Sequence, residues 1–256
     1  MNNKNLIIII IIIIFLSLCG FYLYKKNQKI KKDIETRELT PTETTDDFQV
    51  EKEEEEKTEK NSEKRVLMFG RSVMAKWFYH WGSDNLSPVK KQNYILEYKE
   101  LSNPPAIVDS FENHINNLSD KENSIIFFKL CFDDFEGGSK STAKKNFERN
   151  KKYIEKVYAL TNLKDLKLII GNALPKVPSS TDDYLKWNHK EYNKWLLRFQ
   201  KEHPRDIFIL NMYGVLVDSS GYLRAKYTND IYDSHPNDEA YSALDSELFK
   251  LLKKNF

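Results

Sequence analysis

The sequence predicts an α/β fold in which a central, mostly parallel five-stranded sheet lies between two layers of helices. Short apolar runs of strand length recur from residue 65 to residue 256, and stretches with helical spacing separate them. This part of the chain also has the length of a single domain. Strands that alternate with helices are typical of a parallel sheet covered on both faces.

The predicted elements follow from the spacing of apolar residues. Four apolar runs favour buried strands, and a weaker one at 94–98 makes the fifth. The expected strands are 66–69, 94–98, 125–130, 166–170 and 207–210, and the expected helices are 108–118, 144–160, 183–202 and 238–253. In such a sheet the active site lies beyond the carboxyl ends of the strands.

Polar residues follow the predicted strands at that edge. In chain order they are Arg71 and Ser72, Asp133 and Asp134, Asn172, and finally Asp233 and His235 before the last helix. We therefore expect these side chains to converge on one site.

Ser72 and His235 are the candidates for catalysis. Ser72 begins a helix after a buried strand, where backbone amides could receive an oxyanion, although serine also serves there as a helix cap. His235 has Asp233 two residues before it, so a carboxylate could orient its imidazole, although a loop histidine is often simply exposed. Together they form a nucleophile and a general base.

The order of these residues resembles the SGNH (GDSL-type) hydrolases over residues 65–256. Residues 66–73 (VLMFGRSV) resemble that family's first block, with Arg71 where an aspartate usually stands, and residues 233–237 (DSHPN) resemble its last block. The resemblance implies a flavodoxin-like sheet and an acyl or acetyl ester hydrolase that needs no cofactor. It also implies Ser72 as nucleophile, His235 as general base and Asp233 as the residue that orients His235.

The sequence departs from the family's pattern at three points. The family commonly places its aspartate three residues before the histidine, where this chain has Tyr232. The family's third block, Gly-x-Asn-Asp, is replaced by residues 131–134 (CFDD), which lack the asparagine that donates to the oxyanion. No glycine lies between Gly82 and Gly137, so the second-block glycine has no evident equivalent.

Other residues could contribute to the oxyanion hole or to substrate binding. Arg71 and Asn172 have suitable donors, although Arg71 could instead form an ion pair and Asn172 could simply occupy a turn. Asp133 would repel a developing negative charge unless it is protonated or turned away. Asp134 could hydrogen-bond the loop around Ser72.

The sequence also leaves a different class open. The missing oxyanion groups favour, as an alternative, a catalytically silent SGNH-fold binding or scaffolding module at the membrane. A dinucleotide-binding domain is disfavoured because no glycine-rich loop follows the first strand. The remaining histidines have no ligand-like spacing, so we predict no metal site.

The N-terminal segment 1–24 is predicted to be a membrane anchor. Residues 6–24 include eight consecutive isoleucines and would form a helix about 28 Å long, close to the thickness of a bilayer. Lipidation of Cys19 is the alternative. Five lysines follow the helix and one precedes it, which favours a cytoplasmic domain. Many surface-anchored enzymes have the same layout, however, and we expect a single-pass protein whose domain is extracytoplasmic.

Residues 25–64 are predicted to be a charged, disordered tether between this anchor and the domain at 65–256, because they hold few large apolar residues. The chain has 40 Lys and Arg against 38 Asp and Glu, so bulk charge excludes a nucleic-acid binder. The expected partners are the lipid bilayer, through residues 6–24, and a small ester or acylated glycan as substrate. The sequence does not indicate an oligomeric state.

Overall fold

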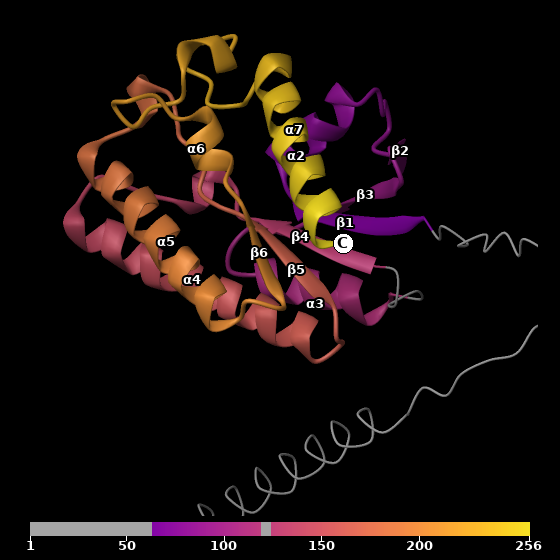
Figure 1. The fold of residues 1–256 in the computed structure, drawn as a ribbon. Helices are drawn as coiled ribbons and strands as arrows, with labels where there is room; N and C mark the ends of the chain where they lie inside the picture. Colours follow the sequence, from indigo (N-terminus) through magenta and orange to yellow (C-terminus); the bar gives the residue numbers. More distant parts are fainter. Residues whose placement is uncertain (1–62, 119–123) are drawn as a thin grey trace, which may run out of the picture. The chain divides into compact units, whose positions relative to one another are not determined.

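The computed structural model describes residues 63–118 and 124–256, and these form an α/β domain. Its sheet has six strands in the order β2-β3-β1-β4-β5-β6 (Figure 1). The strands are β1 (Lys64–Gly70), β2 (Val89–Lys91), β3 (Tyr94–Glu100), β4 (Ser124–Lys129), β5 (Lys167–Gly171) and β6 (Ile207–Leu210). Strands β3, β1, β4, β5 and β6 pair in parallel, so their carboxyl ends share one edge.

The expectation of five strands is wrong by one edge strand. β2 has only three residues, of which two are lysines, so it has neither the length nor the apolar pattern of a buried strand. It pairs antiparallel with β3 across a tight turn in which Gln92 has a φ of 53°. A short, charged strand is a common way to end a sheet, because it discourages pairing with another chain.

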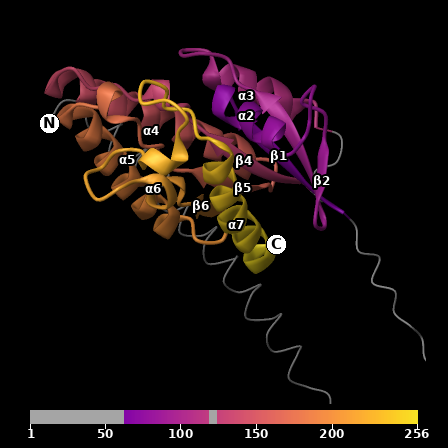
Figure 2. The ribbon, with the colours of Figure 1, turned by 90° about the horizontal axis from the view of Figure 1, so that it is seen from above.

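Helices cover both faces of the sheet (Figures 1 and 2). They are α2 (Ser72–His80), α3 (Ile107–Asn116), α4 (Lys140–Asn162), α5 (Asp183–Glu202), α6 (Met212–Leu216) and α7 (Asp238–Asn255). Residues of α2, α6 and α7 share one hydrophobic cluster with one face of the sheet, and residues of α3, α4 and α5 share a second cluster with the other. The three-layer arrangement predicted from the sequence is present.

Adjacent residues of the central strand β4 serve the two clusters. Phe127 packs edge-on against Trp77 of α2, with ring centroids 6.0 Å apart, and Phe128 packs against Phe111 of α3 at 5.6 Å. Because successive side chains of a strand point to opposite faces, a continuous apolar run is what a doubly covered sheet requires.

The last helix starts immediately after the loop that carries His235. The Asn237 side chain accepts a hydrogen bond from the Ala240 N–H at 3.1 Å and so caps the N-terminus of α7. This cap ends the loop at a defined place. The candidate histidine is therefore fixed three residues before a helix that packs in the core.

The predicted anchor at 6–24, Cys19 and nearly all of the tether at 25–64 lie outside the described residues. Within 63–118 and 124–256, no helix has the length and apolarity needed to cross a membrane. The first strand begins at Lys64, one residue before the predicted start of the domain.

Candidate active site

Ser72 is the first residue of α2 and lies just beyond the carboxyl end of β1. The tight passage from strand to helix depends on Gly70, because a Cβ there would lie 2.7 Å from the Cβ of Met74. The backbone hydrogen bonds of α2 begin with the N–H groups of Met74 and Ala75, which donate to the Arg71 carbonyl. The N–H groups of Ser72 and Val73 precede them and point out of the helix end.

The structure brings Ser72, His235 and Asp233 into one hydrogen-bonded chain. The Ser72 Oγ lies 3.1 Å from the His235 Nε2, and the His235 Nδ1 lies 2.6 Å from the Asp233 Oδ1. The ring of Phe132 packs edge-on against the imidazole at a centroid distance of 5.1 Å. This is the geometry of a nucleophile, a base and the carboxylate that orients the base.

The shorter spacing between Asp233 and His235 does not prevent their contact. The Asp233 carboxylate accepts the His235 backbone N–H at 3.0 Å through the same oxygen that contacts the imidazole. The carboxylate therefore folds back over a turn of two residues. Tyr232, which stands where the family has its aspartate, is 74 % exposed.

The pKa of Asp233 lies below its ordinary value. Partial burial of the carboxyl group raises the pKa, but the hydrogen bonds from the backbone and ring of His235, and its charge, lower it more. Lys76, 3.7 Å from the Asp233 Oδ2, adds to the lowering. Asp233 is thus held as the anion that keeps the Nδ1 of His235 protonated.

Arg71 links the loops that follow three strands. Its guanidinium donates to the Asp134 carboxylate after β4 and to the Asn103 Oδ1 after β3. Asp134 is 1 % exposed, and its second oxygen accepts the Cys131 N–H at 2.7 Å. Arg71 is therefore in an ion pair, the alternative that the sequence left open, and Asp134 hydrogen-bonds the loops around Ser72.

The other two predicted site residues, Asp133 and Asn172, line different cavities. Asp133 is exposed and lines the same cavity as Ser72, with Lys176 3.5 Å from its Oδ1. Asn172 lines another cavity, of about 700 Å³, over β5 and β6. Its amide is engaged with the Asn211 side chain at 2.9 Å and the Tyr213 N–H at 2.7 Å, so the structure does not bring Asn172 to Ser72.

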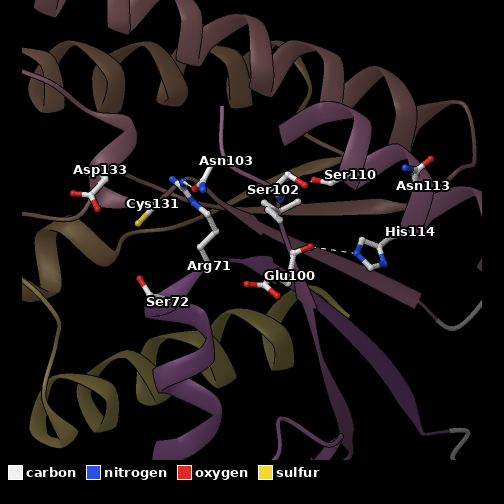
Figure 3. Close-up of a pocket in the computed structure, with 11 residues that line it drawn as sticks. Arg71, Ser72, Glu100, Ser102, Asn103, Ser110, Asn113, His114, Cys131 and Asp133 are labelled. Atoms are coloured by element: carbon white, nitrogen blue, oxygen red, sulfur yellow. Dashed lines mark hydrogen bonds between the residues drawn. The ribbon is translucent and has the colours of Figure 1, made fainter. Parts of the chain in front are cut away.

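A cavity of about 720 Å³ opens beside Ser72. Figure 3 shows Cys131 and Asp133, which follow β4, on one side of Arg71, and Asn113 and His114, from α3, on the other. Most side chains that line the cavity are polar, namely Arg71, Ser72, Glu100, Ser102, Asn103, Ser110, Asn113, His114 and Asp133. Such a wall suits an alcohol that carries many hydroxyl groups better than a long acyl chain.

Sequence reasoning missed the residues that come from the end of β3. Glu100 ends β3, and Ser102 and Asn103 follow it. The apolar pattern of this strand is weak, so its end was not recognised as part of the site. The polar residues at 100, 102 and 103 were the available signal. Within the described ranges, no group of three or more His, Cys, Asp or Glu could hold a metal ion.

Comparison with known proteins identifies the fold. A GDSL-like lipase from Bacteroides thetaiotaomicron matches with a TM-score of 0.55 and 18 % identity, over 76 % of this chain and 90 % of that one. A protein named as an acylhydrolase from Bacteroides fragilis matches with a TM-score of 0.54 and 19 % identity, over 75 % and 87 %. A member of the lipolytic G-D-S-L family from Veillonella parvula matches with a TM-score of 0.52 and 17 % identity, over 74 % and 98 %.

The likeness lies in the structure, since no family model and no curated protein matches the sequence. The domain has the SGNH (GDSL-type) hydrolase fold that the resemblance implied.

Proposed function

We propose that the protein is an SGNH-type serine hydrolase that cleaves a small acyl ester, with Ser72 as nucleophile, His235 as general base and Asp233 as the residue that orients His235. The observation that carries this proposal is the contact of the Ser72 Oγ with the His235 Nε2 at 3.1 Å, in line with the 2.6 Å contact between His235 and Asp233. The SGNH hydrolase fold supports it.

The geometry supports a two-step reaction. The Ser72 Oγ attacks the ester carbonyl while the His235 Nε2 takes the hydroxyl proton, and the imidazolium then gives that proton to the departing alcohol. A water molecule, activated by the same imidazole, attacks the acyl-enzyme and releases the acid and the free Ser72. If an alcohol takes the place of water, the acyl group is transferred instead.

The polar cavity beside Ser72 favours a small acyl group, such as acetyl, on a hydroxyl-rich alcohol. An acyl chain of many carbons would have to lie against Glu100, Asn103 and Asn113, which offer little apolar surface. An O-acetylated glycan fits these requirements. In a transfer reaction, the alcohol that takes the acyl group from Ser72 would be the hydroxyl of another sugar.

We also propose that residues 6–24 anchor the enzyme in a lipid bilayer and that residues 25–64 act as its tether. The proposal rests on the apolar run of the sequence and on the charged, apolar-poor segment that follows it. An anchored, extracytoplasmic domain would meet the glycans of the cell surface.

The test is hydrolysis of p-nitrophenyl acetate by the full-length protein and by Ser72→Ala. We expect Ser72→Ala to lower kcat by about 10³-fold or more, because the nucleophile is lost. Ser246→Ala is the matched control, since Ser246 is exposed on α7 and does not line the cavity. Equal rates for the wild type and Ser72→Ala would contradict the proposal and favour a binding module.

A further inference from the structure

The proposed reaction places a negative charge on the carbonyl oxygen, and the donors that would hold this charge are not evident from the sequence. A serine hydrolase needs two or three such donors, each contributing about 10²–10³-fold to kcat. The Ser72 N–H at the N-terminus of α2 can supply one donor. A second donor has to come from the wall of the same cavity.

The contact between Arg71 and Asn103 fixes which way the Asn103 amide faces. A guanidinium has only donors, so the atom of Asn103 that it contacts must be the acceptor Oδ1. The Asn103 Nδ2 therefore points away from Arg71. No described group accepts a hydrogen bond from Nδ2, and Asn103 lines the cavity beside Ser72.

The position of Arg71 is itself fixed by a buried acid. Asp134, which is 1 % exposed, binds the guanidinium and the Cys131 N–H, and its own carbonyl accepts the buried Asn150 Nδ2 at 2.7 Å. Asn103 lies on an exposed loop, but Arg71 connects its side chain to the buried Asp134, which follows the central strand β4. A donor held in this way costs little reorganisation during the reaction.

The same arrangement removes the charge that would oppose an oxyanion. Asp134 is paired with Arg71, and Asp133 faces Lys176 at 3.5 Å. Each of the two carboxylates in residues 131–134 is thus paired with its own cation. The ion pairs leave the Asn103 amide as a neutral donor at the cavity wall.

We propose that the Asn103 Nδ2 donates to the carbonyl oxygen of the tetrahedral intermediate together with the Ser72 N–H, and that Arg71 is the residue that positions Asn103. When the Ser72 Oγ bonds to the carbonyl carbon, the π electrons move to the oxygen and the hydrogen bond from Nδ2 shortens. When the bond to the leaving alcohol breaks, these electrons re-form the carbonyl, and Asn103 loses no proton. This inference rests on the proposed function.

The test compares Asn103→Ala and Asn103→Asp with Asn116→Ala in the full-length protein. Asn116 is an exposed asparagine at the end of α3 that does not line the cavity, so it is a matched control. We expect Asn103→Ala to lower kcat for p-nitrophenyl acetate by about 10²-fold with little change in KM. Asn103→Asp should lower kcat further, because a carboxylate repels the oxyanion. Asn116→Ala should stay within about threefold of the wild type.

The outcomes separate this inference from the proposed function. Hydrolysis that depends on Ser72, but is unchanged within threefold in Asn103→Ala, contradicts this inference alone. Absence of any Ser72-dependent hydrolysis in the wild type contradicts both. Because Asn103 is exposed, its variants should keep the thermal unfolding midpoint of the wild type, which shows that a loss of kcat is not a loss of fold.

The positioning role of Arg71 has its own readout. Arg71→Met should lower kcat at least as much as Asn103→Ala does, because it releases the Asn103 amide and also leaves the Asp134 carboxylate unpaired. Adding Asn103→Ala to Arg71→Met should cost little more, because the same donor is already lost. Arg71→Lys should recover part of the loss. Losses that multiply in the double variant would show that Arg71 acts independently of Asn103.

Discussion

At the scale of single residues, the contact between Asp233 and His235 explains how a changed spacing can retain its chemistry. The carboxylate reaches the imidazole from two residues away because it also accepts the His235 backbone N–H at 3.0 Å. This turn, with the aspartate two residues before the histidine, replaces the family's usual spacing of three residues. Ser72, more than 160 residues earlier in the chain, is then brought to His235 by the shared edge of the sheet.

Replacement of Asp233 by Asn should leave the fold intact and disable the base. An amide at this position can donate a hydrogen bond to Nδ1, which favours the tautomer that carries its proton on Nε2 and cannot accept the proton of Ser72. We expect kcat for p-nitrophenyl acetate to fall by about 10³–10⁴-fold.

The control for Asp233→Asn is Asp109→Asn, an exposed aspartate in the first turn of α3 that does not line the cavity. A kcat for Asp233→Asn within tenfold of the wild type would show that Asp233 does not orient the base. The KM of both variants should change little, because neither residue lines the cavity.

At the scale of helices and strands, the sequence predicted the central elements because their patterns are unambiguous. Strand β4 is buried along its whole length and reads as a continuous apolar run. The edge strand β2 was missed because three residues with two lysines carry no such pattern. For the same reason, the weak apolar pattern of β3 did not indicate that Asn103 belongs to the site. The structure shows this through the contact of Asn103 with Arg71.

The ion pair between Arg71 and Asp134 could not be predicted from sequence spacing alone. Arg71 and Asp134 are 63 positions apart, and only the pairing of β1 with β4 brings their loops together. The predicted catalytic residues, by contrast, each follow or precede a recognisable element. Asn172 follows β5 as predicted, but strand β4 lies between β5 and β1, and Asn172 lines another cavity.

Helix α5 carries a buried histidine that makes stability depend on pH. Neither ring nitrogen of His189 has a hydrogen-bond partner among the described residues. Burial, aided by the charge of Lys176, lowers the pKa of His189 to about 3. The folded pKa therefore lies below the unfolded value, so the unfolded chain takes up a proton first as the pH falls.

Replacement of His189 by Phe should reduce this pH dependence. For the wild type we expect His189 to cost about 3 kcal/mol of unfolding free energy between pH 7 and pH 4, from about 1.4 kcal/mol per pH unit below the unfolded pKa. The His189→Phe variant lacks this contribution and keeps the ring contacts with Phe135 and Tyr213.

Urea unfolding of both proteins at pH 7 and pH 4 measures the difference. The buried or paired carboxylates, including Asp233, lose stability in the same direction in both proteins and therefore cancel in the comparison. Identical pH dependence in wild type and His189→Phe would contradict the account of His189.

At the scale of the whole molecule, the sequence combines an apolar segment, a charged segment and a compact domain. The near balance of 40 basic and 38 acidic residues is a sum over these parts and describes none of them. The domain shares its α/β fold with a GDSL-like lipase, whereas the first segment has the composition of a bilayer-spanning helix.

Charge inserted into the apolar segment tests the proposed anchor. We expect the full-length protein to remain with the membrane fraction after an alkaline carbonate wash. A double substitution, Ile13→Arg with Ile14→Arg, should release it, because each arginine near the centre of a spanning helix costs about 3 kcal/mol. Lys26→Arg is the control, since it keeps the charge next to the segment. Retention of the double variant would contradict the anchor.

Covalent labelling measures whether His235 activates Ser72 as a nucleophile. Full-length protein treated with a fluorophosphonate probe should carry one adduct, which mass spectrometry should locate on Ser72. The labelling should be lost in Ser72→Ala and slowed at least a hundredfold in His235→Ala, because the base is gone. An unlabelled Ser72, or equal labelling of wild type and His235→Ala, would contradict the account.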